Sequence, residues 1–289
     1  MLKTLQDKIA ESVALIRKAE HLALALQPEQ GFHVGFSGGK DSQVLLALVK
    51  MAGVKYRAVY NVTTNDPPEN VYFIRKHYPD VEFEHQGKNL YRLIEKKGLP
   101  TIFHRWCCEI FKEEAGAGSV VLTGVRREES KKRAGYKPVD VKSNRKEHLE
   151  RKDPYTIEGI EAAGHQCIKG KDKIMVYPML EWTTTDVWVF IAKEHLPVNP
   201  CYEYGGRVGC MFCPYASKEQ IDYYETRYPK FHGLFMEGLS SYLSKRETID
   251  KNFDSVEEYY EWWKSKKSVK AFLREKRRKA EELAQLKLF

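Results

Sequence analysis

The first part of the chain alternates short apolar runs with stretches of helical periodicity. Apolar residues recur every three or four positions over residues 4–27 and stop at Pro28, which predicts a helix. Later apolar runs are typical of buried strands, at residues 32–36, 55–62, 81–85, 119–125 and 174–178. Helical patterns follow the first three of these runs, at residues 44–49, 68–77 and 89–97. This order predicts an α/β fold, a Rossmann-like parallel sheet flanked by helices.

The later part of the chain has a different composition. Residues 137–173 are rich in Lys, Arg, Glu, Asn and Gly with little periodicity, which predicts an exposed insertion; we assign no role to its lone Cys167. The stretch after residue 216 has helical, aromatic-rich patterns and ends in a basic helix. We therefore expect a nucleotide-binding domain over residues 1–215 and a helical, basic region over residues 216–289.

Composition narrows the class of protein. Of the 289 residues 42% are hydrophobic and 30% charged, which is typical of a soluble globular protein. No apolar run approaches the length of a membrane span, and the first residues lack a signal-peptide core, so we expect a cytoplasmic protein with no membrane partner. The net charge of +8 suits nucleic acid or a phosphorylated substrate, without choosing between them.

A glycine pair stands between the first predicted strand and the next helix. The segment reads Ser37-Gly38-Gly39-Lys40-Asp41-Ser42. A strand-to-helix turn leaves unpaired backbone N–H groups at the positive end of a helix, which favours an anion. The glycines let the backbone approach phosphate oxygens, the lysine adds a positive charge, and the two hydroxyls can donate hydrogen bonds. This segment therefore predicts a phosphate site.

The segment is not a Walker A loop. That motif needs a glycine where Val34 stands and a Ser or Thr where Asp41 stands. Two further polar turns are expected at the same sheet edge, because the carboxyl ends of parallel strands meet there. Thr63 and Asp66 follow the second strand, and Gly124 ends the fourth, with arginines after it.

The cysteines form the second candidate site. Cys107 and Cys108 are adjacent, and the later three have Cys-x8-Cys-x2-Cys spacing, at Cys201, Cys210 and Cys213. In a reducing compartment such cysteines are more typical of metal or redox ligands than of disulfides. Four thiolates suit zinc and a [4Fe–4S] cluster equally well by ligand type.

The glycine segment resembles the pyrophosphate loop (PP-loop) of the ATP pyrophosphatases and the PAPS reductase family, whose fold is called adenine nucleotide alpha hydrolase-like. Residues 123–133 are similar to that family's Thr-Gly-x-Arg-x-x-x-Ser-x-x-Arg element. The resemblance implies ATP, or APS or PAPS, with Mg²⁺. It implies nucleotide-binding roles for Ser37, Gly38, Gly39, Lys40, Asp41, Ser42, Thr63, Asp66, Gly124, Arg126, Ser130 and Arg133.

The resemblance also bears on the metal. Residues 105–112 and 178–214 are similar to the cysteine elements of cluster-bearing APS reductases, which favours a [4Fe–4S] cluster over zinc. The ligand pattern Cys107, Cys201, Cys210 and Cys213 matches the iron–sulfur ATP pyrophosphatase component of DNA phosphorothioation systems and related tRNA thiolases. In that pattern Cys108 is a neighbour or a redox thiol. APS reductases attack with a further cysteine near the C-terminus, whereas no cysteine follows Cys213 here.

These observations lead to a hypothesis and two alternatives. The hypothesis is an enzyme that adenylates an acceptor with ATP and then inserts sulfur; its candidate catalytic residues are Lys40, Asp41 and Cys108. The alternatives are a sulfonucleotide reductase and a non-catalytic regulator that senses nucleotide or binds DNA. The expected partners are an adenine nucleotide and either nucleic acid or a sulfur-carrier or desulfurase protein, and a homodimer is left open.

Overall fold

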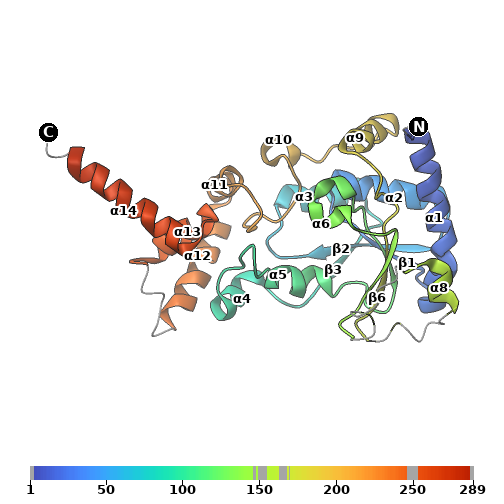
Figure 1. The fold of residues 1–289 in the computed structure, drawn as a ribbon, viewed down its shortest axis with the longest axis horizontal. Coiled ribbons are helices and arrows are strands. Elements are labelled where there is room, and N and C mark those ends of the chain that lie inside the picture. The colour runs from blue at the N-terminus through green and yellow to red at the C-terminus, as the bar shows by residue number, and fades with distance from the viewer. Residues whose placement is uncertain are drawn as a thin grey trace. The chain divides into compact units, whose positions relative to one another are not determined.

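The computed structural model of the chain describes residues 3–145, 148, 155–162, 168, 170–245 and 253–286 (Figure 1). The chain divides into two units, which alternate along the sequence. The first, the sheet unit, comprises Met1–Val62, Pro67–Gln86 and Phe111–Val208. The second, the helical unit, comprises Thr63–Asp66, Gly87–Ile110 and Gly209–Phe289. Within the described ranges, no helix has the length and apolarity that crossing a membrane requires.

The sheet unit is built on a six-stranded sheet in the order β3-β2-β1-β4-β6-β5. The strands are β1 (Phe32–Gly35), β2 (Tyr56–Val62), β3 (Glu82–His85), β4 (Val120–Leu122), β5 (Val139–Lys142) and β6 (Lys173–Val176). All neighbours pair in parallel except β5, which runs antiparallel to β6. The predicted α/β class is confirmed. Because β1 has β2 on one side and β4 on the other, the strand order reverses there, and such sheets bind ligands beyond the carboxyl ends of these strands.

Helices flank this sheet (Figure 1). They are α1 (Leu5–Leu26), α2 (Lys40–Ala52), α3 (Pro68–His77), the 3₁₀ turn η2 (Arg127–Glu129), α6 (Lys131–Ala134), α8 (Ile157–Ala162), α9 (Thr184–Lys193) and α10 (Tyr202–Gly205). The helix α1 begins at a capping box, in which the Thr4 hydroxyl accepts the Asp7 N–H and the Asp7 carboxylate accepts the Thr4 N–H. Its apolar face and that of α2 are buried in one core with the sheet. That core holds α2 and the end of β1 in fixed positions.

The predicted exposed insertion contributes to the fold instead. Among its described residues, Val139 and Val141 of β5 are buried, and so are Ile157 and Ile160 of α8. The expectation of an exposed insertion is therefore wrong for these residues. The apolar alternation of β5 is only four residues long and lies among charges, so periodicity could not reveal it. Cys167 lies outside the described residues.

The helical unit confirms the expected C-terminal helices. Its elements are α4 (Leu90–Lys97), α5 (Trp106–Cys108), α11 (Lys218–Arg227), α12 (Pro229–Ser244), α13 (Val256–Ser265) and α14 (Val269–Leu286). The π-helical turn η1 (Glu109–Glu113) continues α5. Phe235 is packed among the aromatic rings of the helical unit. Its ring centroid lies 5.0 Å from that of Phe212 and 5.4 Å from that of Trp263. The helices α4 and α12 pack closely, since a Cβ on Gly238 would meet the Tyr91 carbonyl oxygen at 2.8 Å.

Candidate functional site

The turn after β1 has the geometry of an anion site. The helix α2 begins at Lys40 directly after it, and Gly39 as the N-cap residue has no side chain to occupy the first N–H groups. Gly38 adopts a φ of +76°, and a Cβ there would lie 2.3 Å from the Asn70 Oδ1. The Ser42 hydroxyl accepts the Ser37 N–H at 3.1 Å and donates to the Gly39 carbonyl at 2.9 Å. The local sequence thus closes the turn, in which the Ser37 and Gly39 N–H groups donate to the hydroxyls of Ser42 and Ser37.

Two buried asparagine side chains donate hydrogen bonds to the backbone of this turn. Asn199, which is fully buried, donates through Nδ2 to the Gly38 carbonyl at 3.0 Å and to the Asn70 Oδ1 at 2.7 Å. Asn70 in turn donates to the Ser37 carbonyl at 3.2 Å. Both residues were missed by the reasoning from sequence. Only the resemblance of the segment that starts at Asn199 could have pointed to one of them.

A tyrosine hydroxyl lies at the beginning of α2. The Lys40 backbone N–H donates to the Tyr202 Oη at 2.8 Å. Burial raises the pKa of Tyr202 to about 12, so this group stays a neutral hydroxyl near pH 7. Its oxygen accepts one of the N–H groups that a bound phosphate would use. Only the resemblance of residues 178–214 covers this residue, which stands on the short helix α10.

Charged side chains are linked beside the turn. Asp41 accepts from the Lys40 Nζ at 2.7 Å and from the Arg126 Nε at 2.7 Å. Arg126 is only 3% exposed and also donates to the Thr184 hydroxyl at 3.2 Å. Gly124 allows this arrangement, because a Cβ there would lie 2.7 Å from the Asp41 carbonyl oxygen. Arg126 therefore holds Asp41 in this structure, and its predicted contact with phosphate stays a prediction.

The other two members of the predicted arginine element lie at the surface, Ser130 exposed and Arg133 half-buried. The Ser130 hydroxyl accepts the Arg133 N–H at 3.3 Å and caps α6, as serine commonly does. The Arg133 guanidinium forms an ion pair with Glu129. Capping and a surface ion pair account for both side chains here, and their nucleotide-binding role stays a prediction.

Four cysteines gather in the helical unit. Cys107 and Cys108 are linked by a side-chain hydrogen bond, which together with burial and the charges of Cys210 and Cys213 raises the pKa of Cys107. The sulfurs of Cys108, Cys210 and Cys213 are therefore within electrostatic range of Cys107. None of the five described cysteines forms a disulfide.

The turn that carries Cys210 and Cys213 is held by Asn65, which is 2% exposed. The Asn65 carbonyl accepts the Met211 N–H at 2.8 Å, and its side chain donates to the Phe212 carbonyl at 3.3 Å. The Thr63 hydroxyl lies 3.5 Å from the Cys210 sulfur and donates to Asp66 at 2.8 Å. Thr63 and Asp66, which were predicted to bind nucleotide, thus belong to the cysteine turn in this unit.

Cys201, the fourth predicted metal ligand, belongs to the sheet unit. Its N–H donates to the Asn199 Oδ1 at 3.0 Å, and burial, with a smaller effect of Glu69, raises the pKa of its thiol to about 12. In the part of the chain that the structure describes, no three His, Cys, Asp or Glu side chains are arranged to hold a metal ion. The donor type of the gathered cysteines nevertheless fits an iron–sulfur cluster or zinc, which both bind thiolates.

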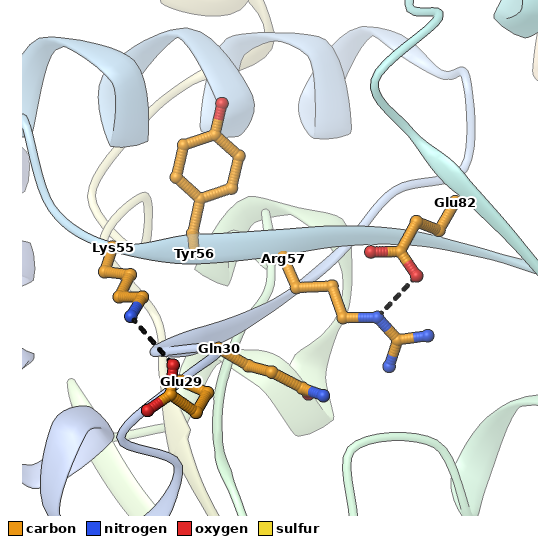
Figure 2. Close-up of a pocket in the computed structure, with 6 residues that line it drawn as sticks. All are labelled: Glu29, Gln30, Lys55, Tyr56, Arg57 and Glu82. Carbon is orange, nitrogen blue, oxygen red and sulfur yellow. Dashed lines mark hydrogen bonds and ion pairs between the residues drawn. The ribbon is translucent and has the colours of Figure 1, made fainter.

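Another pocket lies at the opposite edge of the sheet, where β2 begins (Figure 2). Its volume is about 380 Å³, and Lys55, Arg57 and Glu82 are among the residues that line it. Arg57 pairs with Glu82 at 2.7 Å and Lys55 with Glu29 at 3.9 Å. The charges of this pocket are thus paired among themselves, and it lies away from the carboxyl ends of the strands, where ligands bind in such sheets.

Several known proteins are similar to this chain. An uncharacterised protein of Methanocaldococcus jannaschii is 27% identical over 73% of this chain and 42% of its own length. The chain spans about half the length of the M. jannaschii relatives it matches, 42% of one and 55% of another. Sulfate adenylyltransferase subunit 2 of Rhodospirillum rubrum is 28% identical, over 70% of this chain and 69% of its own. The solved U34-tRNA thiolase NcsA of Methanococcus maripaludis, with its [4Fe-4S] cluster, has a TM-score of 0.42 and 14% identity over 85% of this chain and 82% of that one.

A family model identifies the chain. The phosphoadenosine phosphosulfate reductase domain matches residues 32–216, which include the glycine turn, the arginine element and all three later cysteines. The match covers more than half of the sequence and confirms the predicted resemblance. This protein belongs to the phosphoadenosine phosphosulfate reductase domain family.

Proposed function

We propose that the protein binds ATP, releases pyrophosphate by adenylating an acceptor, and inserts sulfur into that acceptor, which is nucleic acid. The observation that carries the proposal is the glycine turn at the beginning of α2, with Lys40 and Asp41 paired at 2.7 Å beside it. Known members of the family act on adenine nucleotides, and sulfate adenylyltransferase, by its name, transfers an adenylyl group.

In the first step the β and γ phosphates of ATP, carrying Mg²⁺, bind the N–H groups of the turn. The Tyr202 oxygen gives up the Lys40 N–H to them. An oxygen of the acceptor attacks the α-phosphorus, the bond from that phosphorus to the pyrophosphate oxygen breaks, and the acceptor keeps AMP. The Lys40 ammonium stabilises the charge that develops on the departing pyrophosphate. Asp41 keeps this ammonium in place, and Arg126 keeps Asp41 in place.

In the second step a sulfur nucleophile displaces AMP from the acceptor. Cys107, Cys210 and Cys213 would hold a [4Fe–4S] cluster, with Cys201 as the fourth ligand that the sequence predicts. Such a cluster, when bound, supplies a site that carries sulfur. Cys108 stays beside Cys107 as a thiol available for redox work, and its sulfur accepts from the Arg105 Nη1 at 3.5 Å.

Pyrophosphate release from ATP tests the first step. Lys40→Ala should lower kcat by about 100-fold or more, because removing one stabilising donor at developing charge costs on this order. Lys50→Ala is the matched control, since Lys50 lies exposed in the last turn of the same helix, and it should keep the wild-type rate. ATP binding without AMP formation by the wild-type protein would favour the non-catalytic regulator instead.

Metal analysis tests the second step. Anaerobically purified wild-type protein should contain iron and acid-labile sulfide, and Cys210→Ser should contain much less. Comparing Cys107→Ser with Cys108→Ser then identifies which cysteine of the adjacent pair is the fourth ligand. Colourless wild-type protein with stoichiometric zinc would contradict a role for iron.

A sulfonucleotide reductase is the second candidate. The Arg105 guanidinium lies 3.5 Å from the Cys108 sulfur, and such a cation favours the thiolate form that a nucleophile needs. This candidate predicts sulfite release from APS or PAPS with a thiol donor, and its loss in Cys108→Ser. The proposed function predicts no sulfite from either compound.

A further inference from the structure

An aromatic side chain stands fully in solvent near the cysteines of the helical unit. Phe103 is 94% exposed, although phenylalanine is usually buried. It lies in a closed turn, because the Thr101 N–H donates to the His104 carbonyl and the His104 N–H to the Thr101 hydroxyl, both at 3.1 Å. The turn therefore presents this ring to solvent from a fixed backbone.

A second exposed ring is fixed next to this turn. Tyr215 is 53% exposed, and its hydroxyl donates to the Ile102 carbonyl at 3.5 Å. The Arg105 guanidinium lies over the Tyr215 ring, 5.1 Å from the centroid, and also donates to the Cys108 sulfur. We call Phe103, Arg105 and Tyr215 the stacking surface. It joins two rings and one cation at the edge of the cysteine site.

We propose that the stacking surface binds an unpaired base of single-stranded nucleic acid and presents it to the cysteine site. Exposed rings stack on the faces of bases that are not in a duplex, and a neighbouring arginine contacts phosphate or stacks in turn. The net charge of +8 favours the same polyanionic partner. A purely apolar protein partner would need no cation over the Tyr215 ring. The inference rests on the proposed function for the chemistry, whereas binding to this surface does not require ATP.

Fluorescence anisotropy of a labelled 12-nucleotide strand tests this binding with the full-length protein and without ATP. The single strand should bind more tightly than a duplex of the same sequence. Phe103→Leu should weaken binding about tenfold, as expected for one lost base–ring stack, whereas Phe103→Tyr should keep it. Because Leu is apolar but has no aromatic face, this pair separates base stacking from apolar docking. Tyr215→Ala should weaken binding similarly.

The control variant is Tyr72→Ala, which removes a 67% exposed ring from α3 in the sheet unit and should bind like the wild type. Parallel titrations with RNA and DNA strands tell which sugar the surface accepts. Equal affinity for strand and duplex, unchanged binding by Phe103→Leu, or no binding of any strand would overturn the inference. Pyrophosphate release is measured separately, so strand binding without it would overturn the proposed function and leave the stacking surface standing.

Discussion

The glycine turn of the sheet unit and the cysteine turn of the helical unit are built alike but differ in how their polar groups are satisfied without a ligand. Each is held by buried asparagine side chains, Asn199 and Asn70 for the first and Asn65 for the second. In the glycine turn a tyrosine hydroxyl satisfies the first N–H group, so the turn is stable without a ligand. In the cysteine turn the hydrogen bond from Cys108, burial and the neighbouring thiols raise the pKa of Cys107, so its thiol stays protonated without a bound cation. The first turn therefore has its hydrogen bonds in place without a ligand, whereas the thiols of the second need a cation to ionise together.

The largest expected effect concerns the support of the glycine turn. Asn199→Ala removes the hydrogen bonds to Gly38 and Asn70 and leaves buried polar atoms unsatisfied, which costs about 1–3 kcal/mol. ATP should therefore bind about tenfold to hundredfold more weakly, as measured by calorimetry. Asn89→Ala is the control, because Asn89 caps α4 in the helical unit and should affect stability but not ATP affinity. Wild-type affinity in Asn199→Ala would mean that the turn does not depend on this amide.

The matching change in the other region is Asn65→Ala. It removes the two side-chain hydrogen bonds to the Phe212 backbone, although the backbone bond to Met211 remains, so the turn that fixes the thiols of Cys210 and Cys213 is loosened. We expect most of the bound iron to be lost, measured per chain after anaerobic purification. Lys40→Ala serves as the control and should retain wild-type iron. Full iron in Asn65→Ala would contradict the role given to this asparagine.

Acid should destabilise the sheet unit through His33 of β1. Burial is the main reason that the pKa of His33 is lowered from 6.5 to about 4. The unfolded chain therefore binds a proton that the folded chain does not between about pH 6.5 and 4. The stability that depends on neutral His33 is complete above pH 6.5 and falls as pH drops through this window. Between pH 7.5 and 5 we expect a loss of about 2 kcal/mol in urea unfolding.

His33→Gln is the control for this pH effect, because its amide does not titrate. Its unfolding free energy should change less over the same pH range. An identical pH dependence in wild type and His33→Gln would assign the acid sensitivity to other groups.

The smallest expected effect is a gain of affinity. Tyr202→Phe removes the hydroxyl that competes with phosphate for the Lys40 N–H. Because one neutral hydrogen bond contributes about 1 kcal/mol, inorganic pyrophosphate should bind a few-fold more tightly. Calorimetric titration with pyrophosphate measures this. Weaker binding in Tyr202→Phe would show that the hydroxyl donates to the anion rather than competing with it.

Features formed by residues close together in the sequence could be predicted, whereas contacts between distant residues could not. The glycine turn is six consecutive residues between a strand and a helix, so its place in the fold could be predicted directly. The parallel direction of most strands could be predicted from the helices that stand between them in the sequence. Asn199, Asn65 and Tyr202 act through contacts with residues more than 100 positions away, which no local pattern encodes.

One error and one unforeseen contact have the same origin. The short strand β5 has only two buried side chains, Val139 and Val141, so its pattern was lost among neighbouring charges. Thr63 and Asp66 follow β2 as expected, but Thr63 lies beside Cys210, a residue that sequence distance could not connect with it.

The central claim, that ATP is cleaved between its α and β phosphates, is tested most directly by identifying the products formed from ATP. Incubating the wild-type protein with ATP labelled at the α-phosphate and with single-stranded nucleic acid should give labelled AMP, free or attached to the acceptor, together with pyrophosphate. Lys40→Ala should give neither product. Labelled ADP with inorganic phosphate, or intact ATP under conditions in which the protein releases sulfite from APS, would contradict the account.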